Sequence, residues 1–202
     1  SGANCWDINL NTQYDDDAIS FLYSPYFDFS TIGSGRLDFW VNIATENNYD
    51  GLRLEFSNDG GASWQVIGSA NDVCGTNWYN DDQVFAGYFG GTDAWTGTSN
   101  GWMHVAYKLC CTSGIFNNPT PIQFRFAFAS DGSVFTSGVS VDDFCIYAAQ
   151  GDDVGISDIT LPVGGYPVGG TAPVVVVLEN FGATTITSVS INYTVNGAGL
   201  QT

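Results

Sequence analysis

Two adjacent carboxylates, Asp142 and Asp143, lie in the segment GVSVDDFCIYA and are of the residue type that binds hard metal ions. Side chains alternate along a strand, so Asp142 is expected on the face that also carries Phe144 and Ile146. A carboxylate at the edge of an apolar core needs a cation or hydrogen-bond donors. Calcium meets this need, because it takes about six to eight oxygen ligands from carboxylates and carbonyls.

The other ligands of such a site are expected from a second acidic run. Asp15, Asp16 and Asp17 stand just before the first long apolar segment and are the best partners for Asp142. We therefore predict a calcium ion held by this run together with Asp142 and its neighbour. The alternative is that Asp142 caps backbone amides and that the run is a solvated turn.

A second candidate site lies in residues 70–101, a long segment rich in Asn, Gly, Trp and Tyr that we call the insertion. Aromatic rings beside carboxylates and amides suit a sugar, which stacks on a ring while its hydroxyls need planar partners. The residues predicted to bind a glycan or a protein ligand are Trp78, Tyr79, Asp81, Asp82 and Trp95. In one alternative the rings form a small core under the loop. In another, Asp81 and Asp82 hold a second calcium ion.

Five cysteines and a single histidine favour disulfide bonds over a zinc or copper site, and no two cysteines show CxxC spacing. We predict one bond between Cys5 and Cys145, which lie on the first and last strands. A second bond is expected to join Cys74 to Cys110 or Cys111. Disulfide bonds indicate an oxidising, extracellular environment.

The composition excludes several classes of function. The chain has 202 residues, of which 21 are acidic and 4 are Lys or Arg, so its net charge is −17. Too few basic residues are present to neutralise nucleic-acid phosphates or an anionic membrane surface, and no apolar run is long enough to insert into a membrane. The single histidine, His104, lies in a strand-like segment with no G-x-S-x-G motif before it. We therefore expect no enzyme activity.

Short apolar-aromatic runs between Gly, Asn, Asp and Ser clusters predict an all-β fold. Residues 1–150 are expected to form a two-sheet antiparallel jelly-roll sandwich. The predicted strands are 18–29, 36–45, 51–59, 63–68, 102–110, 122–130 and 138–148. The composition changes at residues 150–153, and residues 151–202 contain three further predicted strands. Three strands are too few for a complete sandwich, so we expect a partial second Ig-like β domain there.

The order of these motifs resembles a known extracellular module. The resemblance lies in SPYFDFS (24–30), LDFWVN (37–42), LRLEFSNDGGASW (52–64), IQFRFAFASDGS (122–133) and GVSVDDFCI (138–146). These segments are similar to the MAM-like jelly rolls called cleaved-adhesin domains, which occur in large secreted and surface proteins of Bacteroidetes-type bacteria. Residues 151–202 are similar to the start of the Ig-like, CARDB-like repeats that follow such modules.

The resemblance implies a jelly roll without catalytic activity that commonly carries structural calcium and pairs an N-terminal acidic loop with the last strand. We accordingly expect a secreted or cell-surface adhesion module that binds a glycan or a surface protein. Its other partners are expected to be neighbouring domains of the same polypeptide, with no nucleic acid and no membrane insertion. Two alternatives remain. The chain is an accessory domain of a secreted protease or glycosidase, or a structural spacer whose insertion aromatics are buried.

Overall fold

The structure is a computed structural model that describes residues 4–9, 12–148, 154–161, 173–180, 185–195 and 198–201. Within these ranges the regular elements are β-strands, apart from one short 3-10 helix, η1 (Leu109–Cys111). The prediction of an all-β fold is confirmed. The chain divides into two compact units, residues 1–148 and 149–202, which are described separately.

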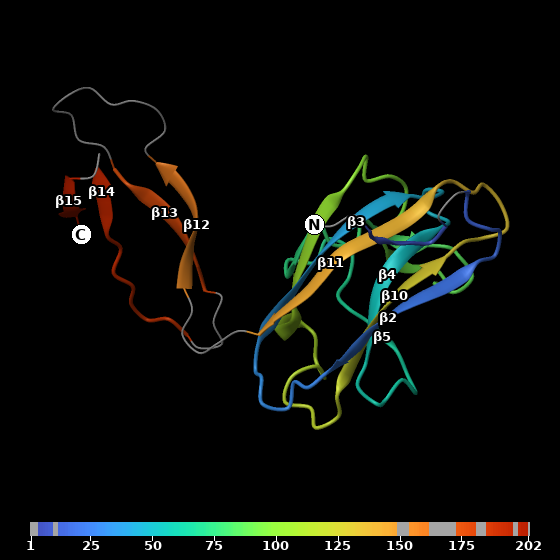
Figure 1. Ribbon diagram of the computed structural model, residues 1–202, viewed down its shortest axis with the longest axis horizontal. Helices are drawn as coiled ribbons and strands as arrows, with labels where there is room; N and C mark the ends of the chain where they lie inside the picture. The colour runs from blue at the N-terminus through green and yellow to red at the C-terminus, as the bar shows by residue number, and fades with distance from the viewer. Residues whose placement is uncertain are drawn as a thin grey trace. The chain divides into compact units, whose positions relative to one another are not determined.

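The first unit is a sandwich of two antiparallel sheets (Figure 1). The five-stranded sheet has the order β1 (Trp6–Asp7), β11 (Gly138–Ala148), β3 (Gly35–Ala44), β9 (Met103–Lys108) and β6 (Gly75–Thr76). The four-stranded sheet has the order β2 (Ile19–Phe27), β10 (Ile122–Ala129), β4 (Gly51–Ser57) and β5 (Gln65–Val66). The chain changes sheet from β2 to β3, from β3 to β4, and again from β9 to β10 to β11. This alternation between sheets is the connectivity of a jelly roll.

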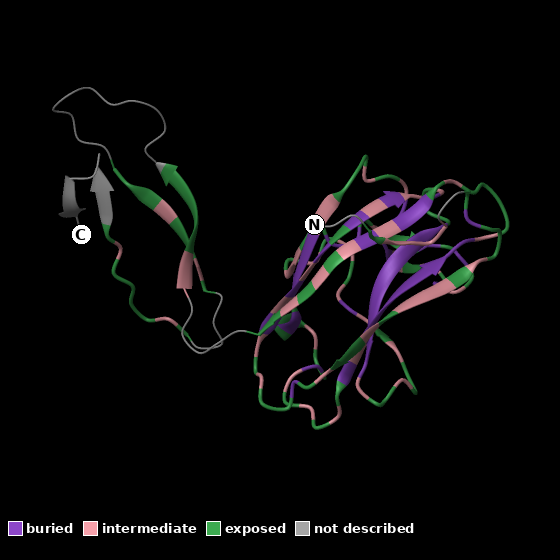
Figure 2. Ribbon diagram, viewed as in Figure 1, coloured by how far each residue is buried: buried purple, intermediate pink, exposed green. Residues whose placement is uncertain are grey.

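The core lies between the two sheets and follows from side-chain alternation (Figure 2). In β3 every second residue is buried, including Leu37 and Phe39. These side chains meet the inward residues of the other sheet, which are Leu52, Leu54, Phe56, Phe124, Phe126 and Phe128. The rings of Phe39 and Phe126 pack edge to face at 4.9 Å between centroids. Each buried side chain of this size contributes about 1.5–3 kcal/mol to folding.

Part of the insertion covers the outer face of the four-stranded sheet. Its hairpin consists of β7 (Asp81–Val84) and β8 (Thr92–Ala94). Apolar side chains of the hairpin region, including Val84 and Phe89, pack against Ala127 and Ala129 on the outer face of β10. All seven residues of β4 are consequently buried, although a half-exposed strand would alternate.

In the second unit, β12 (Val154–Leu161) pairs antiparallel with β13 (Val175–Asn180). A second antiparallel pair joins β14 (Tyr193–Val195) to β15 (Ala198–Gln201). The expected domain boundary after residue 150 lies outside the described residues. The Ig-like character of this unit stays a prediction.

Candidate functional site

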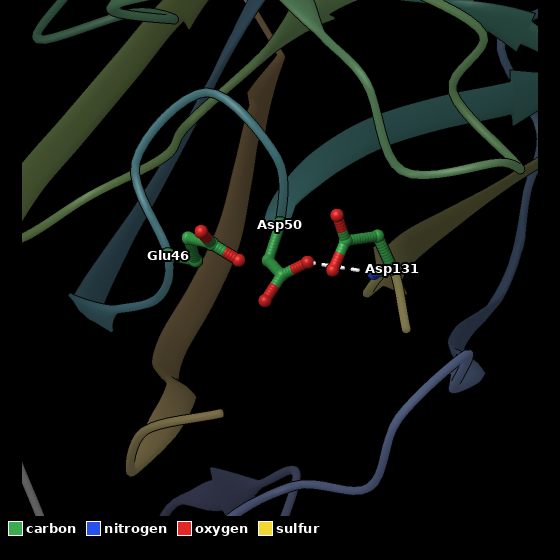
Figure 3. A group of neighbouring side chains, drawn as sticks. All are labelled: Glu46, Asp50 and Asp131. Atoms are coloured by element: carbon green, nitrogen blue, oxygen red, sulfur yellow. Dashed lines mark hydrogen bonds between the residues drawn. The ribbon is translucent and has the colours of Figure 1, made fainter. Parts of the chain in front are cut away.

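Three carboxylates meet at one end of the sandwich, on two turns that are distant in sequence (Figure 3). Glu46 and Asp50 lie on the turn between β3 and β4, and Asp131 follows β10. The pairing of β10 with β4 brings the two turns together, because Ala129 stands opposite Gly51. One oxygen of each carboxylate lies within 4.8 Å of the others. Among the described residues this is the one group of three side chains close enough to share a metal ion.

Asp50 is fully buried and links the members of this acidic cluster. Its Oδ1 accepts a hydrogen bond from the backbone N–H of Asp131 at 2.7 Å. Its Oδ2 accepts one from the hydroxyl of Tyr14 at 2.5 Å. The Tyr14 oxygen in turn accepts the backbone N–H of Glu46 at 3.2 Å. One hydrogen-bond network therefore fixes both turns and the segment that carries Tyr14.

The charges of the cluster oppose one another in a partly dry environment. Burial raises the pKa of Asp50, and the negative charge of Asp131 adds to the effect. Burial, followed by the charges of Asp131 and Asp50, raises the pKa of Glu46. Burial and the contact with Asp50 raise the pKa of Tyr14 to about 12. The cluster thus disfavours its own negative charge and can bind a metal ion, which would neutralise it.

One oxygen of Glu46 has no hydrogen-bond partner. Oε2 is buried, and the described part of the chain provides no donor for it. Nor does any ion pair among the described residues join this cluster to Lys or Arg. A buried, unsatisfied carboxylate oxygen costs about 1–3 kcal/mol or more, so a cation here would remove an unfavourable interaction.

The predicted acidic run Asp15, Asp16 and Asp17 lies at this end of the sandwich but contributes through its backbone. The carbonyl of Asp15 accepts the hydroxyl of Ser130 at 2.8 Å. The N–H of Asp17 donates to the carbonyl of Asp131 at 2.7 Å. The side chains of the run are not members of the group of three carboxylates. The run therefore supports the turn that carries Asp131.

Asp142 and Asp143 do not belong to the cluster. The predicted common face of Asp142, Phe144 and Ile146 is wrong, because a β-bulge interrupts the pairing of β11 with β3. Asp143 has a φ of 52° in this bulge. Asp142 consequently pairs with Trp40 on the outer face, whereas Phe144 packs against the core. Asp142 also lies four residues along β11 from the strand end beside the cluster, which is about 13 Å.

The three insertion rings that were predicted to bind a sugar, Trp78, Tyr79 and Trp95, are buried, which corrects their predicted role as a sugar-binding surface. Trp78, Tyr79 and Trp95 are 6%, 0% and 1% exposed. Each donates its polar hydrogen to a backbone carbonyl, at distances of 2.9 to 3.1 Å. A Trp or Tyr ring buries a large apolar area once its polar atom has a partner. The three rings belong to the main core, where Trp78 and Trp95 contact Phe39, whereas a smaller separate cluster around Val84 and Phe89 lies under the hairpin of the insertion.

Asp81 and Asp82 lie at the start of β7 and do not form a second metal centre with other described residues. The Oδ1 of Asp81 accepts the backbone N–H of Gln83 at 2.7 Å. Asp82 is exposed. Neither carboxylate lines the pocket described next.

An open pocket of about 610 Å³ lies beside the insertion. The three buried rings form part of its lining. Amides and hydroxyls supply most of the remaining polar groups, which come from Asn71, Asn77, Asn80, Thr96, Thr98 and Ser99. No Lys or Arg is among the described residues that line it. The one lining carboxylate, Asp72, accepts the hydroxyl of Tyr107 at 2.8 Å and the N–H of Cys74 at 2.9 Å.

One disulfide bond fixes the insertion to the end of β9. Cys74 is bonded to Cys111, with 6.4 Å between the Cα atoms. Of the two partners left open for Cys74, Cys110 is therefore not the one used, and its thiol is free and exposed. The two candidates are adjacent in η1, so the sequence could not distinguish them. A disulfide bond indicates an oxidising environment.

The predicted bond between Cys5 and Cys145 is not formed, and both thiols are free. The register of β1 on β11 explains this. Trp6 pairs with Val141, so extending the register by one residue places Cys5 opposite Asp142. Cys145 lies three residues further along β11 and beyond the bulge, at about 10 Å, whereas bridged cysteines have Cα atoms within about 7 Å. The prediction identified neighbouring strands but not their register.

Sequence reasoning overlooked the acidic cluster although its elements were visible. Glu46 and Asp50 follow one predicted strand, and Asp131 follows another. The missing information was which strand ends are neighbours. An exposed ring was also overlooked. Trp40 is 41% exposed opposite His104 on the outer face of the five-stranded sheet. The alternation of LDFWVN predicts this orientation.

Comparison with family models and with curated proteins found no match. Among the described residues, no helix has the length and apolar character needed to cross a membrane.

Proposed function

We propose that this chain is a non-catalytic, calcium-stabilised β-sandwich module that serves adhesion or ligand binding in a secreted or cell-surface bacterial protein. The observation that carries the proposal is the meeting of Glu46, Asp50 and Asp131 without a basic ion-pair partner among the described residues. Carboxylate oxygens are the ligands that calcium prefers. The bond between Cys74 and Cys111 supports an oxidising compartment.

The role of the ion is mechanical in this proposal. It joins the turn between β3 and β4 to the turn after β10, and each of these turns connects the two sheets. Without an ion the three carboxylates repel one another, and with one they hold the connections at that end in place. A ligand, glycan or protein, then meets a rigid set of loops and loses less entropy on binding.

Thermal unfolding with and without calcium tests the proposal. Protein stripped with EDTA should melt at a lower temperature than protein with excess Ca²⁺. An excess of 100 times the dissociation constant stabilises by about 2.7 kcal/mol. Asp131→Asn should abolish the response, while Asp82→Asn, which changes an exposed carboxylate outside the cluster, should preserve it. An unchanged melting temperature, together with no metal in elemental analysis of the purified protein, would disprove the calcium role.

A structural spacer is the second candidate function, and one observation favours it. The three rings of the insertion that were predicted to contact a ligand are buried. A spacer requires the same stable sandwich but no binding site. Binding assays against glycans separate the two candidates, because a spacer gives no specific signal.

A further inference from the structure

We propose that the open pocket beside the insertion binds a neutral carbohydrate. This inference rests on the proposed ligand-binding function and names the class of ligand and its site. The pocket has a volume of about 610 Å³, within the range of sites for small ligands. Its lining comes from two stretches of the insertion, residues 71–80 and 95–99, and from Ile43 and Met103 of the five-stranded sheet.

The lining has no charge that is available to a ligand. Among the described lining residues there is no Lys or Arg to bind a phosphate, sulfate or carboxylate. Each oxygen of the one carboxylate, Asp72, already accepts a hydrogen bond from the protein. In a chain with a net charge of −17, an anionic ligand is also repelled. The pocket is therefore suited to a neutral molecule.

Three side chains at the pocket retain hydrogen-bonding capacity. Asn71 is exposed, and its side-chain amide makes no hydrogen bond to any described residue. Asn77 donates through Nδ2 to the carbonyl of His104 at 2.9 Å, which leaves Oδ1 to accept from a ligand. The hydroxyl of Thr98 accepts the N–H of Asn100 at 3.1 Å and keeps its proton to donate. Amides and hydroxyls of this kind match the hydroxyl groups of a sugar.

The other parts of the pocket are fixed before any ligand arrives. Asn80 accepts the N–H of Thr96 and donates to its carbonyl, at 2.9 and 3.0 Å. Trp78 and Trp95 pack edge to face at 5.0 Å, and their indole N–H groups are bonded to backbone carbonyls. The disulfide bond of Cys74 fixes the same stretch covalently. A preformed site of this kind binds with a small entropic cost.

An array of immobilised neutral, sialylated and sulfated oligosaccharides tests the inference, with titration calorimetry on the neutral glycan that gives the strongest signal. Binding is expected to neutral glycans only. Asn71→Ala should weaken it by about three- to ten-fold, the effect of one lost hydrogen bond. Thr98→Trp, which fills the pocket mouth, should weaken it more than about ten-fold.

Two controls make the result decisive. Asn117→Ala changes an exposed asparagine with a φ of 54°, close to the 59° of Asn71, so it carries the same backbone strain at another place. Trp40→Ala removes the exposed indole of the five-stranded sheet. Neither should change the affinity. Should Thr98→Trp fail to fold, Asn71→Ala and its control decide alone.

The inference is overturned by a blank array, by binding of charged glycans as strong as that of neutral ones, or by loss of binding in Trp40→Ala but not in Asn71→Ala. The calcium role is tested separately, by the thermal unfolding experiment with and without calcium. A protein that responds to calcium but binds no neutral glycan disproves this inference alone. A protein that binds neutral glycans through Asn71 but shows no calcium response disproves only the calcium role.

Discussion

Two acidic side chains are buried in the sandwich, and they are neutralised in different ways. Glu55 lies on the outer face of the four-stranded sheet, where Oε1 accepts from Arg53 and Oε2 from Arg125, each at 2.6 Å. The guanidinium of Arg125 also stacks on Trp64, at 4.0 Å from the ring centroid. Asp50, at the end of the sandwich, instead meets two further carboxylates and the hydroxyl of Tyr14.

This difference shows which buried carboxylate is neutralised by side chains of the protein and which depends on protons or cations from the solution. The whole sequence has only 4 basic residues, and two of them surround Glu55. A third, Arg36, pairs with Asp38. No ion pair among the described residues joins Lys or Arg to the carboxylates around Asp50, so we expect these carboxylates to rely on protons or cations from solvent. The contribution of the acidic cluster to stability should therefore change with calcium and pH. The contribution of Glu55 should change mainly when Glu55 or one of its arginine partners is mutated.

Replacing Arg125 should produce the largest loss. Arg125→Met leaves Glu55 with one guanidinium in a buried site and removes the stacking on Trp64, so the free energy of unfolding should fall by about 3–5 kcal/mol. Urea denaturation measures the change. The control Arg36→Met breaks a pair whose arginine is 42% exposed and should cost about 1 kcal/mol or less. Equal losses in the two variants would contradict internal neutralisation of Glu55.

Removing the hydroxyl of Tyr14 should have the next largest effect. Tyr14→Phe leaves Oδ2 of the buried Asp50 without this donor, at a cost of about 1–3 kcal/mol in metal-free protein. Tyr49→Phe is the control, because Tyr49 lies on the same turn as Asp50 but is exposed. Urea denaturation of both variants in EDTA gives the comparison. If the two tyrosines prove equivalent, Asp50 does not depend on this hydrogen bond.

Neutralising one carboxylate should have opposite effects in the two regions. Asp131→Asn removes a charge that repels Asp50 but keeps the acceptor for the N–H of Ser133, so metal-free protein should gain about 1 kcal/mol or less. Glu55→Gln should instead destabilise, because it leaves two buried guanidinium groups unpaired. Urea denaturation in EDTA shows whether each variant raises or lowers the free energy of unfolding. Destabilisation by both variants would mean that the cluster is not repulsive.

The smallest predicted effect is a pH dependence of metal-free protein. Asp50 and Glu46 have pKa values raised above 3.8 and 4.5, mainly by burial. Their favourable contribution is therefore complete below about pH 4 and is lost as the pH rises through the raised values. Calcium competes with these protons, so its effect on the melting temperature should grow from about pH 5 to pH 7. A calcium effect that is constant over this range would refute the linkage.

The strands were predictable because their signal is local. Alternation in RLDFWVNIAT predicts a strand over 36–45, and the structure has Gly35–Ala44. Likewise, 122–130 corresponds to Ile122–Ala129. The same rule failed within β11, since a bulge with Asp143 in the left-handed region reverses the alternation. Asp is one of the residues that tolerate this conformation, but many aspartates do not adopt it.

The candidate site depended on information that no local pattern contains. Asp50 and Asp131 are adjacent because β4 and β10 are paired, although 81 residues separate them in sequence. The acidic run at Asp15 was predicted to be near the metal ion, yet its carboxylates lie outside the group of three. The buried rings of the insertion show the same limit. Their residue types suit both a ligand surface and a core, and only packing distinguishes the two.

The complete burial of β4 has a consequence for protein engineering. The hairpin of the insertion acts as a third layer over the four-stranded sheet, and other insertion residues belong to the five-stranded sheet and the main core, so the insertion cannot be treated as a removable loop. A shortened version without residues 70–101 would expose Ala127, Ala129 and the Glu55 ion pairs to water. Such a version would need a redesigned polar face on β4 and β10 to stay soluble. Sequence changes that diversify this module are best directed to the pocket rim.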